Sequence, residues 1–150
     1  MPEKIFNQSL SAASERNKAP ILAALSSYLK PGDTILEVGS STAQHANYFT
    51  QYLDVIWQCS EQASHLQQLK TWLNDTIRLL PAIALDVNQY AWETKQYDAV
   101  FTANTLHVMN NESYRYFLNQ VHYALKANGK FIIYGPIHYS HKPLSPSNCD

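Results

Sequence analysis

Apolar residues are spaced along the chain in two alternating ways, one typical of short buried strands and one typical of helices. Short apolar runs rich in β-forming residues predict five strands, at residues 34–38, 55–59, 79–85, 97–103 and 130–134. Between them, apolar residues recur three or four positions apart and predict helices. Strands and helices that alternate in this way are typical of a parallel sheet with right-handed crossovers. The pattern predicts an α/β fold with a doubly wound, mainly parallel sheet.

Proline and glycine indicate where several of these elements begin or end. Pro20 suits the first turn of a helix that ends before Gly32, and the polar residues that precede Pro20 predict irregular structure. Asn128 and Gly129 predict the end of the last helix. Pro81 places the third strand at an edge of the sheet, because proline cannot donate a hydrogen bond. Together with the crossover rule, Pro81 favours the strand order 3-2-1-4-5, in which the first strand is central.

Acidic residues follow the second and third predicted strands, and a glycine follows the first. Ligands of open α/β sheets bind beyond the carboxyl ends of the strands. Glu61 can accept hydrogen bonds from both ribose hydroxyls, Asp86 can accept one from an adenine amino group, and the loop at Gly39 offers backbone N–H groups. Taken singly, Asp86 is also explained as a helix N-cap and Glu61 as a solvated acid at a helix start. The three features together predict an adenosine site.

The spacing within the first loop distinguishes between two nucleotide cofactors. A dinucleotide-binding loop of the G-x-G-x-x-G type has a third glycine, and counting from Gly39 this position holds the bulky Gln44. Glu37 lies two residues before Gly39, where an acid can orient the loop or meet the ammonium group of S-adenosylmethionine. The sequence therefore favours S-adenosylmethionine over a nicotinamide cofactor.

Composition narrows the choice of partners. The net charge is −1, and no basic run suggests binding to a nucleic-acid backbone. Two cysteines favour a reducing compartment, and no apolar run approaches the roughly 18 residues of a membrane helix. His138, His141 and Cys149 lack a fourth ligand for zinc. We expect a soluble, cytoplasmic protein without a metal, a nucleic-acid partner or a membrane partner.

Several short motifs occur in a fixed order from about residue 14 to the end of the chain. They are Glu15-Arg16-Asn17, Leu36-Glu37-Val38, Thr42 with Gln44-His45, Leu85-Asp86-Val87, Asn104 with His107, and Tyr134-Gly135-Pro136. As an ordered set they resemble the methyltransferase-like 26 family, also called domain of unknown function 938. This family consists of class I S-adenosylmethionine-dependent methyltransferase-like proteins. The resemblance implies a Rossmann-like fold and a methyl-donor site, without defining the substrate.

The strand ends and this resemblance together give a set of expected site residues. The donor is expected to contact Glu37, Gly39, Ser40, Ser41, Thr42, Ala43, Glu61, Asp86 and Asn104. Arg16, Asn17 and Tyr134 are expected on the acceptor side. His107 is the candidate general base, because imidazole titrates near neutrality, although a purely structural histidine explains it equally well. The expected activity is methyl transfer to an unidentified small molecule.

The chain departs from the family pattern in its loop and in the acid after the second strand. The family loop reads A-S-G-T-G-Q-H, whereas Ser41 and Ala43 replace both glycines here. If either position has a positive φ, the replacement costs about 1 kcal/mol or more. Glu61 stands where the family has aspartate. A non-catalytic protein that keeps the fold is therefore the alternative function.

The chain is also shorter than the family pattern, because 15 residues follow Gly135. We expect one domain with an N-terminal extension at residues 1–17 and an irregular tail at residues 136–150. This domain would lack the strands 6 and 7 that class I methyltransferases add. An uncovered fifth strand would then favour a homodimer that pairs two copies of it.

Overall fold

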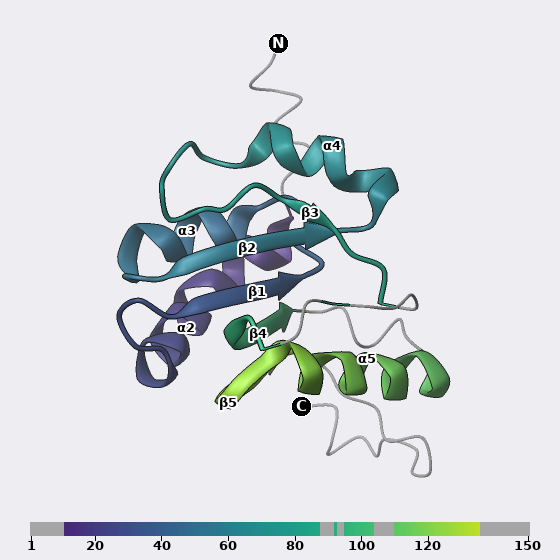
Figure 1. The fold of residues 1–150 in the computed structure, drawn as a ribbon. Helices are drawn as coiled ribbons and strands as arrows, with labels where there is room; N and C mark the ends of the chain where they lie inside the picture. Colours follow the sequence, from purple (N-terminus) through teal and green to yellow (C-terminus); the bar gives the residue numbers. More distant parts are fainter. Residues whose placement is uncertain (1–10, 88–91, 93–94, 104–109, 136–150) are drawn as a thin grey trace, which may run out of the picture.

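The computed structural model describes residues 11–87, 92, 95–103 and 110–135 of the chain (Figure 1). Its strands are β1 (Thr34–Val38), β2 (Ile56–Glu61), β3 (Ile83–Ala84), β4 (Tyr97–Ala103) and β5 (Leu125–Tyr134). They form a parallel sheet of order β3-β2-β1-β4-β5, with β1 at the centre. The predicted fold class and strand order are confirmed, and β1 and β4 have the predicted bounds.

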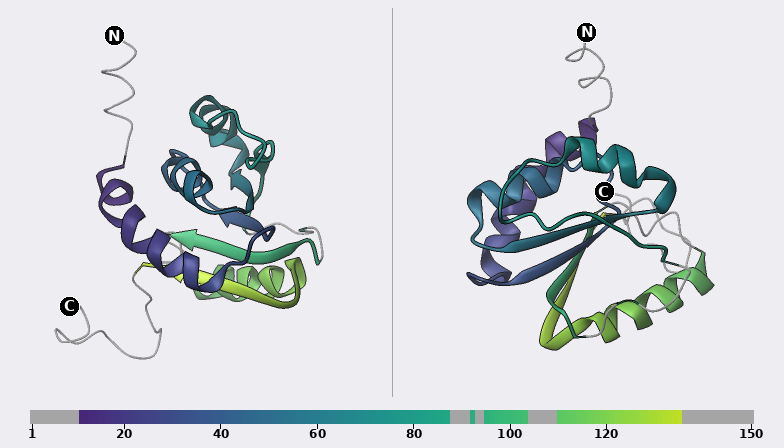
Figure 2. Two further views of the ribbon diagram at one scale, coloured as in Figure 1. Left: turned by 90° about the vertical axis from the view of Figure 1, so that its left-hand side faces the viewer. Right: turned by 45° about the horizontal axis from the view of Figure 1, so that its top comes forward.

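Helices pack on both faces of the sheet and give a three-layered domain (Figure 2). They are α2 (Ala12–Tyr28), α3 (Gln44–Tyr52), α4 (Ala63–Trp72) and α5 (Asn111–Ala124). Side chains from α2, α3 and α4 share one core cluster, while α5 contributes to a second cluster on the other face. The carboxyl ends of β1 and β2 lie at the right-hand side of the sheet in Figure 1.

The alternation of side chains along β1 decides which residue faces the α2–α3 layer. Ile35 belongs to the core cluster on that face, whereas Leu36 and Val38 belong to the cluster beneath α5. Successive residues of a strand point to opposite faces, so Glu37 lies on the same face as Ile35. The end of β1 thus carries a carboxyl group into the buried layer between the sheet and these helices.

Helix α2 begins eight residues before the predicted start at Pro20, so the expectation of irregular structure there is wrong from Ala12 onward. Ser11 is the N-cap, and its hydroxyl accepts a hydrogen bond from Ser14 N at 3.2 Å. Pro20 lies inside the helix and removes one backbone donor. Contacts between α2 and α3, absent from any local sequence signal, stabilise the additional turns.

Strand β3 is shorter than predicted, with two residues in place of seven. An isolated bridge between Trp57 and Leu79 precedes it, and Pro81 separates the bridge from the strand. Because proline has no N–H to donate, the ladder is interrupted at this point. The position of β3 at the edge of the sheet agrees with the prediction.

The boundary between α5 and β5 also differs from the prediction. The helix ends at Ala124, and Leu125 is both its C-cap and the first residue of β5. Asn128, with φ of 66°, and Gly129 lie in an irregular start of β5 rather than at a helix end. A Cβ at Gly129 would lie 2.9 Å from the carbonyl oxygen of Lys126, so only glycine allows this close approach.

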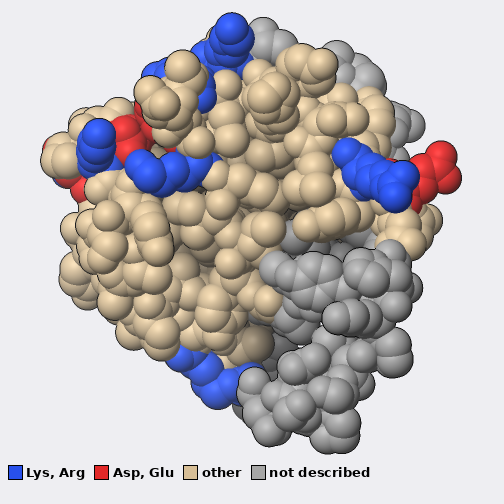
Figure 3. Space-filling model, turned by 90° about the horizontal axis from the view of Figure 1, so that it is seen from below, with Lys and Arg blue, Asp and Glu red and all other residues tan. Residues whose placement is uncertain are grey.

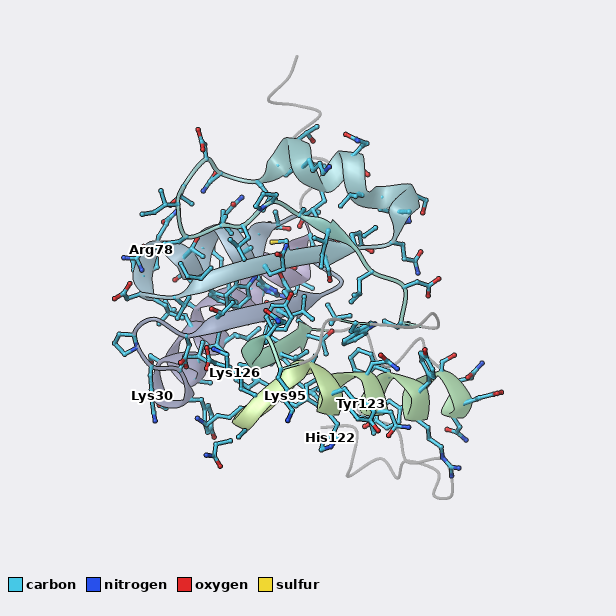
Figure 4. All side chains as sticks on the ribbon, in the orientation of Figure 1. Lys30, Arg78, Lys95, His122, Tyr123 and Lys126 are labelled. Carbon is cyan, nitrogen blue, oxygen red and sulfur yellow. The ribbon has the colours of Figure 1, made fainter. Side chains whose placement is uncertain are left out.

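Charged side chains lie mainly near the edges of the face shown in Figure 3, and uncharged residues cover most of the coloured surface. In Figure 4, Lys30 and Arg78 lie on the side of the sheet where the strands begin, and Lys95 and Lys126 lie near the starts of β4 and β5. Two of them form ion pairs, Arg78 with Asp54 at 3.0 Å and Lys126 with Asp98 at 3.4 Å. Among the described residues, no helix is both long and apolar enough to span a membrane.

Strand β5 is the edge strand opposite β3 in the described sheet. Residues 136–150, which include the expected tail and the histidines and cysteine weighed as zinc ligands, lie outside the described residues. The homodimer through β5 therefore stays a prediction.

Candidate functional site

A cavity of about 470 Å³ opens at the carboxyl ends of β1 and β2. This volume is in the range of small-molecule sites. Six of the residues predicted to hold a donor line it, namely Glu37, Gly39, Ser40, Ser41, Thr42 and Glu61. The structure thus brings the end of β1, the following loop and the end of β2 together around one space.

The loop between β1 and α3 has an unusual backbone. Gly39, Ser41 and Ala43 all have positive φ, at 77°, 51° and 62°. The second and third of these are the positions where the resemblance expects glycine. A left-handed conformation costs a residue with a Cβ roughly 1–2 kcal/mol. We expected backbone strain at Ser41 and Ala43 if φ is positive there. Both residues have a positive φ, so this strain is present at both positions.

Hydrogen bonds to the end of β2 hold this strained loop in place. Ser40 N donates to Ser60 O at 2.9 Å, and Ser60 N donates to Ser40 Oγ at 3.1 Å. Ser41 N donates to Glu61 Oε2 at 2.9 Å. Within the loop, Ala43 N donates to Ser40 O at 2.9 Å. Side chains of serine and glutamate therefore stabilise a conformation that glycine would adopt without strain.

Replacing Ser41 by glycine is expected to raise the free energy of unfolding by about 1 kcal/mol, because it relieves backbone strain at an exposed side chain. Ala43→Gly is expected to be nearly neutral. Its methyl group is fully buried, and losing about 0.8 kcal/mol of burial offsets the relief of strain. Urea unfolding of both variants checks this difference. A destabilised Ser41→Gly variant would show that the loop is not left-handed at this residue in solution.

Glu37 lies at the base of the cavity and is only 2% exposed. Trp57 Nε1 donates a hydrogen bond to its Oε1 at 3.1 Å. Burial raises the pKa of Glu37 to about 7, although the hydrogen bond from Trp57 acts in the opposite direction. A carboxyl group with a pKa near neutrality can be charged or neutral at working pH, depending on what binds beside it.

His45 adjoins Glu37 but does not form an ion pair with it. Its Nε2 lies 2.8 Å from Asn17 Oδ1, an acceptor, which assigns the ring proton to Nε2. The ring stacks on Phe49 with centroids 5.3 Å apart. Burial lowers the pKa of His45 to about 4, so the ring is neutral near pH 7. Nδ1, 4.0 Å from Glu37 Oε2, therefore faces the carboxyl group without a positive charge.

Glu61 extends from the end of β2 to the rim of the cavity. Besides the bond from Ser41 N, its Oε1 accepts a hydrogen bond from Gln62 N at 3.0 Å. Each carboxylate oxygen has a second lone pair, so Glu61 keeps acceptor capacity for a ligand. The longer side chain of glutamate in place of aspartate reaches the loop as well as the cavity.

The remaining predicted donor residues lie apart from the cavity or outside the described residues. Ala43 is fully buried beneath the loop, and Asp86 is partly buried two residues after β3. Neither is among the described residues that line the cavity. Asn104 lies outside the described residues.

On the predicted acceptor side, the described residues do not meet at the cavity. Arg16 is exposed on α2, and Asn17 is buried with its side chain bonded to His45. Tyr134, at the end of β5, is 41% exposed. His107 lies outside the described residues. The acceptor side remains a prediction.

Sequence reasoning missed one wall of the cavity. Ser11, Ala13 and Ser14, from the first turn of α2, line it together with Gln44 at the start of α3. The polar segment before Pro20 gave no apolar periodicity, and Gln44 was weighed only as a replacement for glycine. The signal that could have revealed this wall is the presence of two polar motifs, Glu15-Arg16-Asn17 and Gln44-His45, whose side chains bond to each other in the structure.

The sheet order and a cavity beyond the carboxyl ends of its central strands are those of a Rossmann-like fold. The chain belongs to the family described as protein of unknown function DUF938, which matches residues 8–150.

Solved structures of low sequence identity share this fold. PH0226 from Pyrococcus horikoshii is 14% identical with a TM-score of 0.69, over 82% of this chain and 58% of that protein. A TehB-like S-adenosylmethionine-dependent methyltransferase from Corynebacterium glutamicum is 16% identical with a TM-score of 0.62, over 81% and 68%. The 1,6-didemethyltoxoflavin-N1-methyltransferase of Burkholderia thailandensis, solved with its substrate and S-adenosylhomocysteine, is 19% identical with a TM-score of 0.60, over 80% and 52%. The chain thus spans little more than half of the first and third proteins.

Proposed function

We propose that this chain binds S-adenosylmethionine and transfers its methyl group to a small molecule. The observation that carries this proposal is the cavity at the carboxyl ends of β1 and β2, with Glu37 at its base and Glu61 at its rim. Ligands of open α/β sheets bind at this position. The fold shared with S-adenosylmethionine-dependent enzymes supports the same assignment.

The charge of the cavity fits this cofactor better than a dinucleotide. Two carboxyl groups line it, and no lysine or arginine is among the described residues that do so. S-adenosylmethionine carries a sulfonium and an ammonium group, which acidic side chains attract. A nicotinamide dinucleotide carries a pyrophosphate, which the same side chains would repel. The residues that line the cavity therefore support S-adenosylmethionine over a nicotinamide cofactor, as the spacing within the loop does.

Each acidic residue has a part in holding the donor under this proposal. Glu37 would meet the ammonium group, Glu61 the ribose hydroxyls, and Asp86 the adenine amino group. When bound, the donor supplies an activated methyl group, and its transfer requires mainly proximity and alignment with the acceptor. The loop and β2 would supply the fixed geometry for this, because hydrogen bonds between them hold the loop in place.

A non-catalytic binding or structural protein that keeps the methyltransferase fold is the second candidate. The observation in its favour is the positive φ of Ser41 and Ala43, two residues with a Cβ in the loop that faces the ligand. Ser41 lines the cavity, so its Cβ brings side-chain atoms to where a glycine would leave open space, whereas Ala43 is fully buried and would act through the backbone of the loop. If this weakens binding, the double variant Ser41→Gly/Ala43→Gly will bind S-adenosylhomocysteine more tightly than the parent.

Titration with S-adenosylhomocysteine distinguishes the two candidates. A ligand ammonium beside Glu37 favours the charged carboxylate. Because the pKa of Glu37 is about 7, the group is about half protonated at pH 7, so binding there is expected to release roughly half a proton, and the affinity is expected to fall by up to about tenfold per pH unit below 7. Calorimetric titration in buffers of different ionisation enthalpy measures how many protons are released on binding. The control is Glu37→Gln, which cannot release one. Absence of binding at every pH would favour the non-catalytic candidate. Binding without proton release would show that Glu37 does not contact the ammonium group.

A further inference from the structure

The first turn of α2 is attached to the rest of the domain by polar contacts. The buried residues of α2 are Asn17, Ile21 and Leu25, so its first turn buries no apolar side chain. Ser11, Ala13 and Ser14 nevertheless form one wall of the cavity. Apolar packing begins more than one turn later, and other interactions must hold this wall in place.

The side chain of Gln44 provides most of these interactions. It is 8% exposed, and its Oε1 accepts hydrogen bonds from Ser11 N at 2.7 Å and from the Thr42 hydroxyl. Its Nε2 donates to Glu15 Oε1 at 2.8 Å and to Ser11 O at 3.2 Å. Only a carboxamide can both donate and accept in this way. The next residue, His45, adds the buried bond to Asn17 at 2.8 Å.

These contacts, which we call the α2–α3 bridge, consist of Ser11, Glu15, Asn17, Gln44 and His45. Two neighbouring residues of α3 pair with two residues of α2 that lie two positions apart, so the register between the helices is defined. Gln44 also contacts Thr42 of the loop that lines the cavity. The bridge thus connects the α2 wall directly to the proposed donor loop.

We propose that Gln44 is a positioning residue that holds the first turn of α2 across the cavity, so that the ligand site is complete only while the α2–α3 bridge is formed. This explains why a bulky amide occupies the position of a third glycine. Loop and wall then order together, and a ligand that contacts both would strengthen the bridge. The identity of the ligand rests on the proposed function, whereas the attachment of α2 does not.

Hydrogen exchange tests the attachment without any ligand. In Gln44→Ala, the amides of residues 14–17, the first of the helix with hydrogen-bond acceptors, are expected to exchange at least tenfold faster than in the parent. Asn47→Ala is the matched control. Asn47 lies on the same helix and does not line the cavity; its Nδ2 donates a hydrogen bond to Trp72 O, and its Oδ1 accepts one from Asn74 N. Its loss is expected to lower overall stability without selectively opening residues 14–17. Unchanged exchange in Gln44→Ala, or equal opening in both variants, would overturn the proposal.

A charge exchange tests the link to the ligand. Gln44→Glu places a carboxylate beside that of Glu15 and is expected to weaken S-adenosylhomocysteine binding at least tenfold. Adding Glu15→Gln restores a donor–acceptor pair and is expected to recover most of that loss. Glu15 is not among the described residues that line the cavity, so recovery must act through α2. A loss without recovery would overturn the positioning role. If the parent protein does not bind S-adenosylhomocysteine, the proposed function is wrong. The hydrogen-exchange experiment would still decide whether Gln44 holds the first turn of α2.

Discussion

The stability that Glu37 contributes is expected to fall by about 3 kcal/mol as pH rises from 4.5 to 7, and Glu37→Gln should abolish this change. The folded protein holds the proton up to a pKa of about 7, because burial disfavours the carboxylate, whereas the unfolded chain releases it near 4.5. Between these values the native state binds more protons, so raising pH favours unfolding. The contribution is complete below 4.5 and is lost through pH 7.

His45 produces a pH dependence of the opposite sign. Its pKa is lowered from 6.5 to about 4 by burial, so the unfolded chain binds more protons between these values. Its contribution to stability is complete above pH 6.5 and is lost as pH falls towards 4. In the parent, the two slopes oppose each other between about 4.5 and 6.5. Stability in this range is therefore expected to be nearly independent of these two groups.

Urea unfolding of the parent and of Glu37→Gln from pH 4 to 8 measures both effects. Glutamine can keep the hydrogen bond from Trp57 while removing the titration. The variant should gain about 2 kcal/mol between pH 4.5 and 6.5, where the parent changes little. Other titrating groups affect both proteins and cancel in the difference. Parallel curves for the two proteins would show that Glu37 titrates in its ordinary range.

Glu61→Ala is expected to weaken S-adenosylhomocysteine binding by about 1–3 kcal/mol, or roughly 5- to 150-fold. The change removes the proposed acceptor for the ribose hydroxyls. It also removes the acceptor of Ser41 N and Gln62 N, so the strained loop loses a contact that holds it. Glu112→Ala, at an exposed acid in the first turn of α5, is the control for losing one negative charge.

Calorimetric titration of these variants and of Asp86→Ala decides the donor assignment. Asp86→Ala is expected to have a loss of similar size if Asp86 contacts the adenine amino group. If Glu61→Ala and Asp86→Ala bind as tightly as the Glu112→Ala control, the donor site is not at these strand ends. Loss in Glu61→Ala alone would keep the cavity and exclude the adenine contact.

Local sequence was sufficient for the sheet and for part of the site. The runs at residues 34–38 and 97–103 are apolar and rich in β-forming residues, and both strands have the predicted bounds. Pro81 and the handedness of crossovers were enough for the strand order. Because the carboxyl ends of parallel strands lie at one edge, the strand pattern alone was enough to place Glu37 and Glu61 around one cavity.

Contacts between distant segments decided what the local pattern could not. The first turn of α2 forms despite Pro20, because Gln44 and His45 bond to residues about 30 positions earlier. The pKa of Glu37 depends on the layers that exclude water from it, which no motif encodes. The sequence determined the fold, the loop and its acids. The tertiary structure decided the left-handed conformation of the loop, the position of the α2 wall and the charge states of Glu37 and His45. These depend on desolvation and on hydrogen bonds between elements.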